Sequence, residues 1–274
     1  MTMNCTTPSN PRFHSTTLTA VCLIHALVAS LALGVSGCSS ITSTANDAKA
    51  VAVEPAPDAG FIKNPELQSK RADLPFQKVW IKQGFDKKNY SKLVVAPVNT
   101  QYLLEMDWMH KLSGANLISD IKQDIADLAA YFHNQVVNEF KNDPKHRFVV
   151  IEPPVGHKQK ALRLELALIE IDPSEPVLHA LGWLTLGGGT AAGVINQRRA
   201  AFEARLRDLQ TNEVVATFAD RDMQDAGPLD LTRLTWYGPA KGIMNQWAKQ
   251  IVQIANRKPG ESVTDPTPFT LRPF

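Results

Sequence analysis

The sequence predicts a single α+β domain in which two main amphipathic helices pack on one face of a mixed β-sheet. Strictly alternating leucines in "ALRLELALIEID" are typical of a half-buried strand, and two long segments repeat apolar residues every three or four positions, as helices do. The elements follow the order β-α-β-β-β-β-α, so the helices supply the apolar layer that a one-sided sheet needs. The chain has 274 residues, 44% of them hydrophobic, which is material for one sizeable core.

The first half of the domain predicts a strand, a long helix and a second strand. The strand is expected in "SKLVVAPVNT", residues 91–100, with Pro97 at its end or at a sheet edge. The helix is expected over Asn116–Asn142 and is closed by Pro144, and "RFVVIEPP" follows as a short strand. This order predicts a parallel strand pair joined by a crossover. The apolar stripe of the helix consists of Ile118, Ile121, Ile125, Leu128, Phe132 and Val136.

The second half predicts three strands and a final helix. The leucine alternation shifts phase at Ile169, which indicates a bulge or a second buried face. A hairpin is expected in "RAAFEARLRDLQTNEVVATFADRD", residues 199–222, with its turn at 210–213. The helix is expected in "YGPAKGIMNQWAKQIVQIANRK", where Pro239 suits the first turn. Its apolar stripe consists of Ile243, Trp247, Ile251 and Ile254.

The N-terminus has the layout of a secretory signal peptide. Arg12 precedes an uncharged apolar run, residues 18–35, and small residues follow in "VSGCSS". The tetrad Val35–Cys38 resembles the lipobox of bacterial lipoproteins. That resemblance implies that residues 1–37 are removed and that Cys38 becomes acylated on its sulfur and its new amino group. The alternatives are an ordinary signal peptide, or an N-terminal membrane helix that happens to contain a cysteine.

A lipid anchor on Cys38 makes the bilayer the first expected partner. Several acyl chains hold a protein at a membrane persistently, whereas one chain does so only marginally. In such lipoproteins an aspartate after the cysteine favours the inner membrane of enteric bacteria; here Ser39 stands in that position, so we expect the periplasmic face of the outer membrane. Removing Arg12 with the leader reduces 29 basic residues to 28, against 27 acidic ones. This balance, with no basic stripe, argues against a nucleic-acid partner.

Composition divides the rest of the chain. After Cys38 a segment rich in Ser, Thr, Ala and Pro predicts a flexible tether, so that residues 38–60 comprise the lipidated cysteine and the tether. The globular domain is then expected over 61–258, followed by a loose, Pro- and Thr-rich tail over 259–274. The domain contains no cysteine, so no disulfide is expected in it.

The stretch "VLHALGWLTLGGGTAAGVI", residues 177–195, contains no charged residue. Its glycines are poor material for a membrane helix. They also precede a strand pattern rather than the helix that a nucleotide-binding glycine loop requires. What remains is a glycine-broken connection that packs on its own domain or forms a contact surface with a partner. That candidate contact surface consists of Trp183, Leu184, Leu186, Gly187, Gly188 and Gly189.

Chemistry-bearing motifs are weak throughout the chain. The sequence has no G-x-S-x-G, H-E-x-x-H or phosphate-binding loop, and the histidines lack ligand spacing, so no catalytic residue, metal or cofactor is predicted. The group Asp220, Asp222 and Asp225 fits a solvated strand end better than a cation site. The alternation of Glu203 with two arginines predicts a solvent-exposed sheet face with cross-strand charge pairs. Core or edge packing is the expected role of the tryptophans, Trp247 included.

Three segments carry a family resemblance: "GFIK" at 60–63, "YSKLVVAPV" at 90–98 and "FEARLRDLQTNEVVATFADRD" at 202–222. Together they resemble an uncharacterised bacterial lipoprotein family, the family of unknown function DUF3313. Asn212 stands where that family's hairpin is expected to have glycine, and a left-handed turn position tolerates asparagine. The resemblance implies an envelope lipoprotein and transfers no catalytic residue.

Three functions stay open from the sequence. The first is a non-enzymatic outer-membrane lipoprotein that binds an envelope component or assists envelope assembly. The second is a subunit of an oligomeric membrane or export assembly that uses residues 177–195 as its contact element. The third is an envelope hydrolase whose site has no recognised motif.

Overall fold

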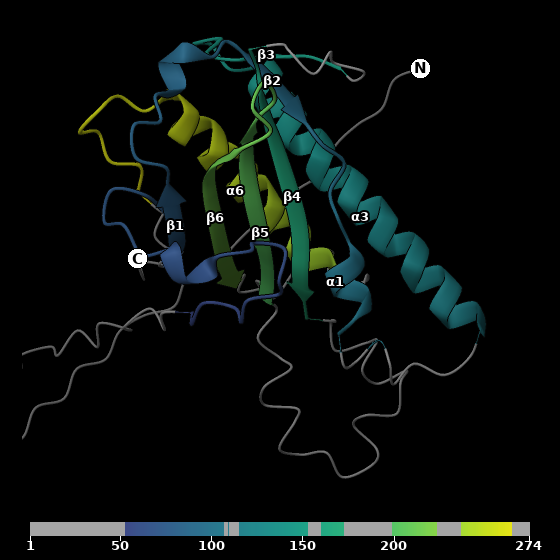
Figure 1. Ribbon diagram of the computed structural model, residues 1–274. Coiled ribbons are helices and arrows are strands. Elements are labelled where there is room, and N and C mark those ends of the chain that lie inside the picture. Colours follow the sequence, from purple (N-terminus) through teal and green to yellow (C-terminus); the bar gives the residue numbers. More distant parts are fainter. Residues whose placement is uncertain are drawn as a thin grey trace, which may run out of the picture. The chain divides into compact units, whose positions relative to one another are not determined.

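A computed structural model describes residues 53–106, 109, 115–152, 160–172, 199–223 and 237–264. Within these residues six strands form one mixed sheet in the order β1-β6-β5-β4-β2-β3 (Figure 1). The strands are β1 (Lys78–Ile81), β2 (Lys92–Val95), β3 (Val149–Val150), β4 (Leu162–Ile171), β5 (Arg199–Asp208) and β6 (Val214–Met223). The helices are α1 (Gln101–Leu104), α3 (Ala115–Lys141) and α6 (Gly238–Asn256), with short 3₁₀ turns η1 (Pro65–Leu67) and η2 (Lys87–Asn89). The predicted α+β architecture is confirmed.

Strand pairing follows the chain order in part. β2 lies parallel to both β3 and β4, and the long helix α3 intervenes between β2 and β3, as the sequence predicted. β4, β5 and β6 are successive antiparallel neighbours. β1 adds an antiparallel edge strand beside β6, with Val79 opposite Phe218. The sequence did not predict β1, because four residues are too few to show a clear alternation.

The phase shift in β4 is a bulge. Leu168 lies opposite Phe202 and Glu170 lies opposite Ala201, which leaves Ile169 without a partner across the ladder. Leu168 therefore faces the main core, while Ile169 belongs to a smaller cluster on the other face of the sheet. In the β5–β6 turn, Asn212 takes the left-handed conformation expected of it, with φ of 59°.

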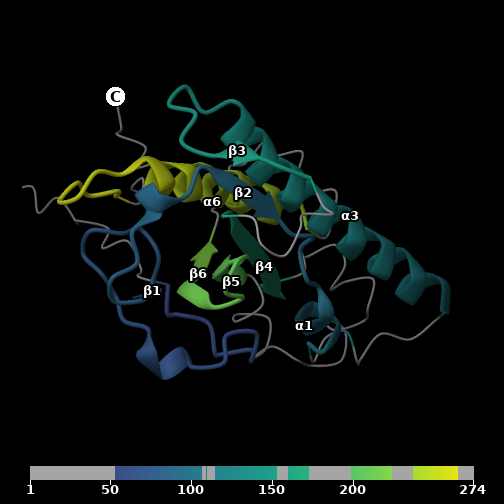
Figure 2. The same ribbon diagram turned by 45° about the horizontal axis from the view of Figure 1, so that its top comes forward.

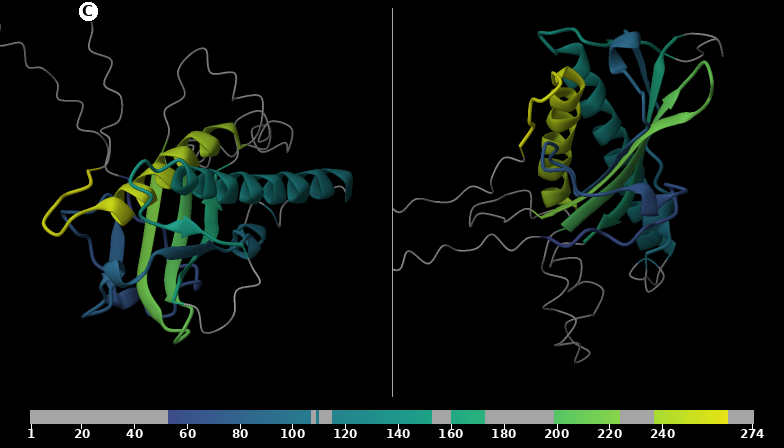
Figure 3. Two further views of the ribbon diagram at one scale, coloured as in Figure 1. Left: turned by 90° about the horizontal axis from the view of Figure 1, so that it is seen from above. Right: turned by 60° about the vertical axis from the view of Figure 1, so that its left-hand side comes forward.

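Helices α3 and α6 pack against each other and lie on the same face of the sheet (Figures 2 and 3). The predicted stripes are buried from Ile121 to Val136 in α3 and from Ile243 to Ile251 in α6, while Ile254, in the last turn of α6, is partly buried against the core. The spacing of these residues places them along one side of each helix, so both helices contribute to one hydrophobic core. Within the described part of the chain, no helix combines the length and apolarity that crossing a membrane requires.

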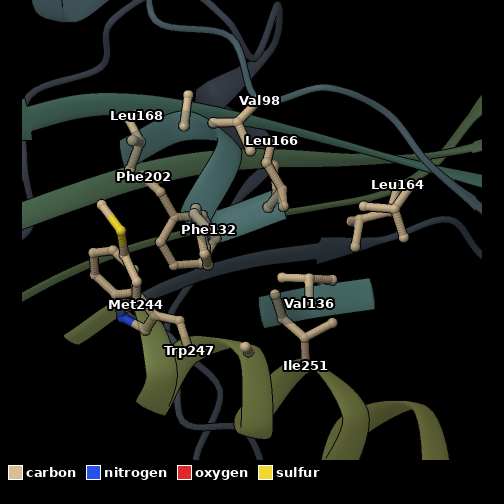
Figure 4. Close-up of a cluster of buried hydrophobic side chains, with 14 of the residues drawn as sticks. Val98, Phe132, Val136, Leu164, Leu166, Leu168, Phe202, Met244, Trp247 and Ile251 are labelled. Carbon is tan, nitrogen blue, oxygen red and sulfur yellow. The ribbon is translucent and has the colours of Figure 1, made fainter. Parts of the chain in front are cut away.

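Trp247 lies at the centre of this core (Figure 4). Its ring centroid is 4.5 Å from that of Phe202 on β5 and 5.9 Å from that of Phe132 on α3, so three elements meet there. The indole Nε1 donates a 2.9 Å hydrogen bond to Asp220 Oδ2. Asp220 is 8% exposed, so the predicted solvated strand end is wrong for this residue: the helix α6 covers it.

Replacing Trp247 with alanine should lower the free energy of unfolding by about 3–5 kcal/mol, because it removes a buried aromatic side chain and one partner of Asp220. Urea denaturation measures the change. Lys249→Ala, an exposed position two residues along the same helix, is the control and should change stability by no more than about 0.5 kcal/mol. Equal effects of the two substitutions would contradict the central role of Trp247.

Candidate ligand-binding cavity

A cavity of about 330 Å³ lies on the helix-bearing side of the sheet. Its lining residues come from β1, β2, β4, β5 and β6 below and from the last turns of α3 and α6 above. The inner wall consists of side chains that are at most 5% exposed: Leu74, Phe76, Val79, Leu93, Phe140, Leu162 and Leu164. Well-packed cores contain few voids larger than a water molecule, so an apolar space of this size is a candidate ligand site.

The mouth of the cavity lies where the lining becomes exposed. Ile81, at the end of β1, is 37% exposed, and the η2 turn and the residues after α6 are the exposed charged parts of the lining. Four cationic residues and one carboxylate belong to this region: Lys87, Lys88, Arg257, Lys258 and Asp86. The cavity therefore combines a hydrocarbon interior with a predominantly basic entrance.

Lys87 joins the two sides of the mouth. Its Nζ donates to the backbone oxygens of Ile254, at 2.8 Å, and Arg257, at 2.6 Å, which are carbonyls at the C-terminal end of α6. A cation there complements the negative end of the helix dipole. Burial of the ammonium group, followed by the nearby guanidinium groups of Arg257 and Arg147, lowers the pKa of Lys87 to about 8, although Glu261 and Asp86 act in the opposite direction.

Arg257, also at the mouth, is engaged by partners of its own. Its guanidinium pairs with the carboxylate of Asp73 and donates to the backbone oxygen of Glu261. Arg71 also pairs with Asp73, at 2.8 Å, and together the two arginines hold the pKa of this carboxyl well below its usual range. These contacts fix the chain after α6 against the segment that precedes β1.

The other face of the sheet carries charged side chains under a cover. Glu203 on β5 is 2% exposed, and its carboxylate accepts hydrogen bonds from the backbone N–H groups of Ala59, at 2.8 Å, and Ile62, at 2.9 Å. The prediction that Glu203 lies on a solvent-exposed face is therefore wrong. Residues 53–62 lie over this face, opposite the helices (Figure 2).

The predicted cross-strand charge pairs are present beside Glu203. Arg205 on β5 pairs with Glu165 on β4 at 2.9 Å, and its guanidinium lies 3.9 Å from the ring centroid of Phe61. Arg221 on β6 likewise pairs with Glu170 on β4. Buried charges are tolerated only when they are paired and hydrogen-bonded, so the ion pairs and the bonds to Glu203 offset the cost of covering this face.

The predicted site residues have different outcomes. Cys38 and the contact surface of residues 183–189 lie outside the described residues, as does Asp225. His133 Nδ1 lies 3.1 Å from the backbone oxygen of Ala96. Among the residues that the structure describes, no group of three or more His, Cys, Asp or Glu side chains is arranged to hold a metal ion.

The cavity itself was missed from the sequence. Its wall combines residues from Leu74 to Pro259, and each apolar member fits an ordinary core position when its segment is considered alone. The only local signals are the pair Lys87–Lys88 and the run "NRKPGE" after the last helix, and neither indicates an apolar cavity until the fold brings them together.

Comparison with known families connects this fold to a group of proteins. Residues 57–251 match the family described as "Protein of unknown function (DUF3313)". The chain belongs to the DUF3313 family. The resemblance inferred from the three sequence segments is thus confirmed. The matched range includes the covering residues 57–62 and most of the cavity wall.

Solved structures similar to this DUF3313 chain share little sequence with it. A dodecamer of a PelC variant from Paraburkholderia phytofirmans is 11% identical with a TM-score of 0.35, and the match covers 65% of this chain and 97% of that chain. A DUF330-family protein from Xanthomonas campestris is 11% identical with a TM-score of 0.35, covering 61% and 86%. A lipoprotein from Neisseria meningitidis is 12% identical with a TM-score of 0.21, covering 61% and 99%.

No curated protein matches the sequence. The descriptions of the DUF3313 family and of these three structures name no enzyme.

Glu203→Ala should release the covering segment of this DUF3313 protein from the sheet, because two backbone N–H groups lose their acceptor. We expect amide hydrogen exchange at Ala59 and Ile62 to become at least about tenfold faster, in line with the loss of one or two hydrogen bonds to a charged group. Exchange measured by NMR tests this, with the exposed Glu66→Ala as control. Unchanged exchange at both amides would show that Glu203 does not hold the segment.

Proposed function

We propose that this protein is a non-enzymatic, lipid-anchored binding protein of the bacterial envelope, and that the apolar cavity is its ligand site. The observation that carries the proposal is the apolar pocket of about 330 Å³ that opens from the hydrophobic core to the surface. A hydrophobic ligand gains free energy by filling such a pocket, because apolar surface on both partners leaves water. Ligand pockets in proteins have volumes of about 300–1,000 Å³, so the space is sufficient for a small molecule or a single hydrocarbon chain.

The lining supports binding rather than chemistry. Among the described residues that form it there is no serine, cysteine or histidine, and Asp86 is the only carboxylate. Asp86 Oδ1 accepts the backbone N–H of Lys88 at 2.9 Å, which uses it as the cap of the η2 turn. A nucleophile with an adjacent general base, which hydrolysis by covalent catalysis requires, is not found in this part of the molecule.

The anchor is proposed to be acylated Cys38, at the periplasmic face of the outer membrane. The lipobox-like Val35–Cys38 and the serine at position 39 support this placement. The described chain is already packed at Val53, whose backbone oxygen accepts from Gln77 Nε2 at 2.6 Å. Residues 39–52 then remain as tether, with a root-mean-square reach on the order of 20 Å if they behave as a random coil. The cavity would thus stay close to the membrane surface.

Metabolic labelling with a radioactive fatty acid should mark the wild-type protein and leave Cys38→Ala unlabelled, because the acyl chains need the cysteine sulfur and the new amino group. Cys22→Ala is the matched control, since Cys22 lies in the apolar run of the same leader, and it should be labelled like the wild type. Labelling of Cys38→Ala at the wild-type level would refute the anchor.

Filling the cavity should abolish binding of an apolar reporter. Ala255, in the last turn of α6, lines the cavity, and Ala255→Phe places an aromatic ring there. We expect its affinity for N-phenyl-1-naphthylamine to be at least about tenfold weaker than that of the wild type, or about 1.4 kcal/mol. Fluorescence titration of the processed chain, with serine at position 38 to omit the acyl chains, measures this.

The matched control is Gln253→Phe, which adds the same ring at an exposed position of the same helix turn. This variant should bind the reporter like the wild type. If the wild type fails to enhance the fluorescence, or if Ala255→Phe enhances it equally, the cavity is not a binding site.

A further inference from the structure

We propose that the cavity binds the single acyl chain of an amphiphile with an anionic head group, and that Lys88 and Lys258 hold the head at the mouth. This inference rests on the proposed function and specifies its ligand class. It is carried by two independent features of the cavity: the extent of its apolar wall and the charge of its entrance.

The apolar wall is elongated. Leu93, Leu164, Leu206, Phe218 and Val79 belong to β2, β4, β5, β6 and β1, which are consecutive neighbours in the sheet. Neighbouring strands lie about 4.8 Å apart, so five strands extend over at most ~19 Å. A volume of 330 Å³ distributed along such a wall suits a slender ligand. It is also at the small end of the range for ligand pockets, which favours one hydrocarbon chain over a two-chain lipid.

The entrance has an excess of positive charge. Of its ionised side chains, Lys87 and Arg257 are already engaged, the first by the carbonyls at the end of α6 and the second by Asp73. Lys88 and Lys258 add two more positive charges, against the one carboxylate Asp86 in the lining, so the entrance attracts an anion.

Lys88 and Lys258 are the cations that remain available. Both are exposed, and no acceptor among the described residues lies within hydrogen-bonding or ion-pairing distance of either Nζ. The nearby carboxylates are otherwise engaged: Asp86 accepts the backbone N–H of Lys88, and Glu261 accepts that of Lys258 at 2.8 Å. Two flexible ammonium groups at an apolar opening, one on η2 and one after α6, suit a carboxylate or phosphate at the end of an acyl chain.

The test uses the full lipidated protein in phosphatidylcholine nanodiscs and four probes with the same photoreactive 12-carbon chain. The probes are dodecanoate, dodecyl phosphate, dodecanol and dodecylamine. After irradiation, mass spectrometry locates the labelled peptides, and labelling is normalised to that of the bilayer lipid. We expect one or both anionic probes to label peptides of the cavity wall, such as those containing Phe76 or Leu164, at least about tenfold more than dodecanol or dodecylamine does, since removing two charge-assisted contacts costs this much or more.

The head-group assignment is tested by Lys88→Gln combined with Lys258→Gln. This double variant should lose the preference for anionic probes and keep the weak labelling by dodecanol, because the apolar wall is unchanged. Lys122→Gln combined with Lys249→Gln removes two exposed lysines from the outer faces of α3 and α6 and should retain the full preference. Labelling by only one anionic probe would identify the head as a carboxylate or as a phosphate, and either result supports the proposal.

Three outcomes would overturn the inference, and they differ in what they leave standing. Equal labelling of the wall by all four probes would refute the anionic head group but keep the cavity as a hydrophobic site. Wall labelling by none of the probes would refute the proposed function as well. Labelling that appears only in a chain ending at Thr264 would assign the cavity to the protein's own last ten residues rather than to an amphiphile.

Discussion

The carboxylate of Asp220 is the group on which the positions of helix α6 and edge strand β1 depend. One of its oxygens accepts from Trp247 on α6, and the other accepts from the backbone N–H of Gln77 at 3.1 Å, immediately before β1. The side chain of Gln77 in turn accepts from the backbone N–H of Arg221, which neighbours Asp220 on β6. One buried acidic residue therefore sets the position of α6 across the sheet and the register of β1 against β6. Because α6 and β1 both line the cavity, these bonds help to position two parts of its wall.

The two faces of the sheet differ in the kind of side chain that they bury. The helix face is mostly hydrocarbon, with the Asp220–Trp247 hydrogen bond within it, and the cavity lies on this face. On the opposite face Glu165 and Glu170 pair with arginines and Glu203 accepts two backbone N–H groups, and these partners offset the cost of covering the charges with residues 53–62. That cover is also the first packed part of the chain after the proposed anchor. The hydrogen bonds to Glu203 therefore hold the start of the packed chain on the face of the sheet opposite the cavity.

The features that were predicted correctly from the sequence are those that a local residue pattern encodes. The stripe of α3 runs for several turns, the leucines of β4 alternate without a break, and Asn212 suits a left-handed turn; each signal is complete within its own segment. Glu203 and Asp220 were assigned to solvent because strand periodicity reports which face a residue occupies but does not report what covers that face. Their covers, residues 59–62 and Trp247, are distant in the chain. The cavity was not predictable for the same reason: it is a space left between segments, and a sequence pattern describes the segments only.

The basic residues at the mouth of the cavity have unequal roles. A lysine at the end of a helix normally stabilises the helix, and Lys87 does so for α6 from outside it, since it belongs to η2. Arg147 donates to the backbone oxygens of Lys87 and Tyr90, which fixes η2 against the chain before β3. These two residues therefore hold the mouth in shape and have little left to offer a ligand. Lys88 and Lys258 contribute no such internal bond through their ammonium groups within the described structure. In the proposed complex their charges would select an anionic ligand. The fold without ligand does not depend on these two ammonium groups.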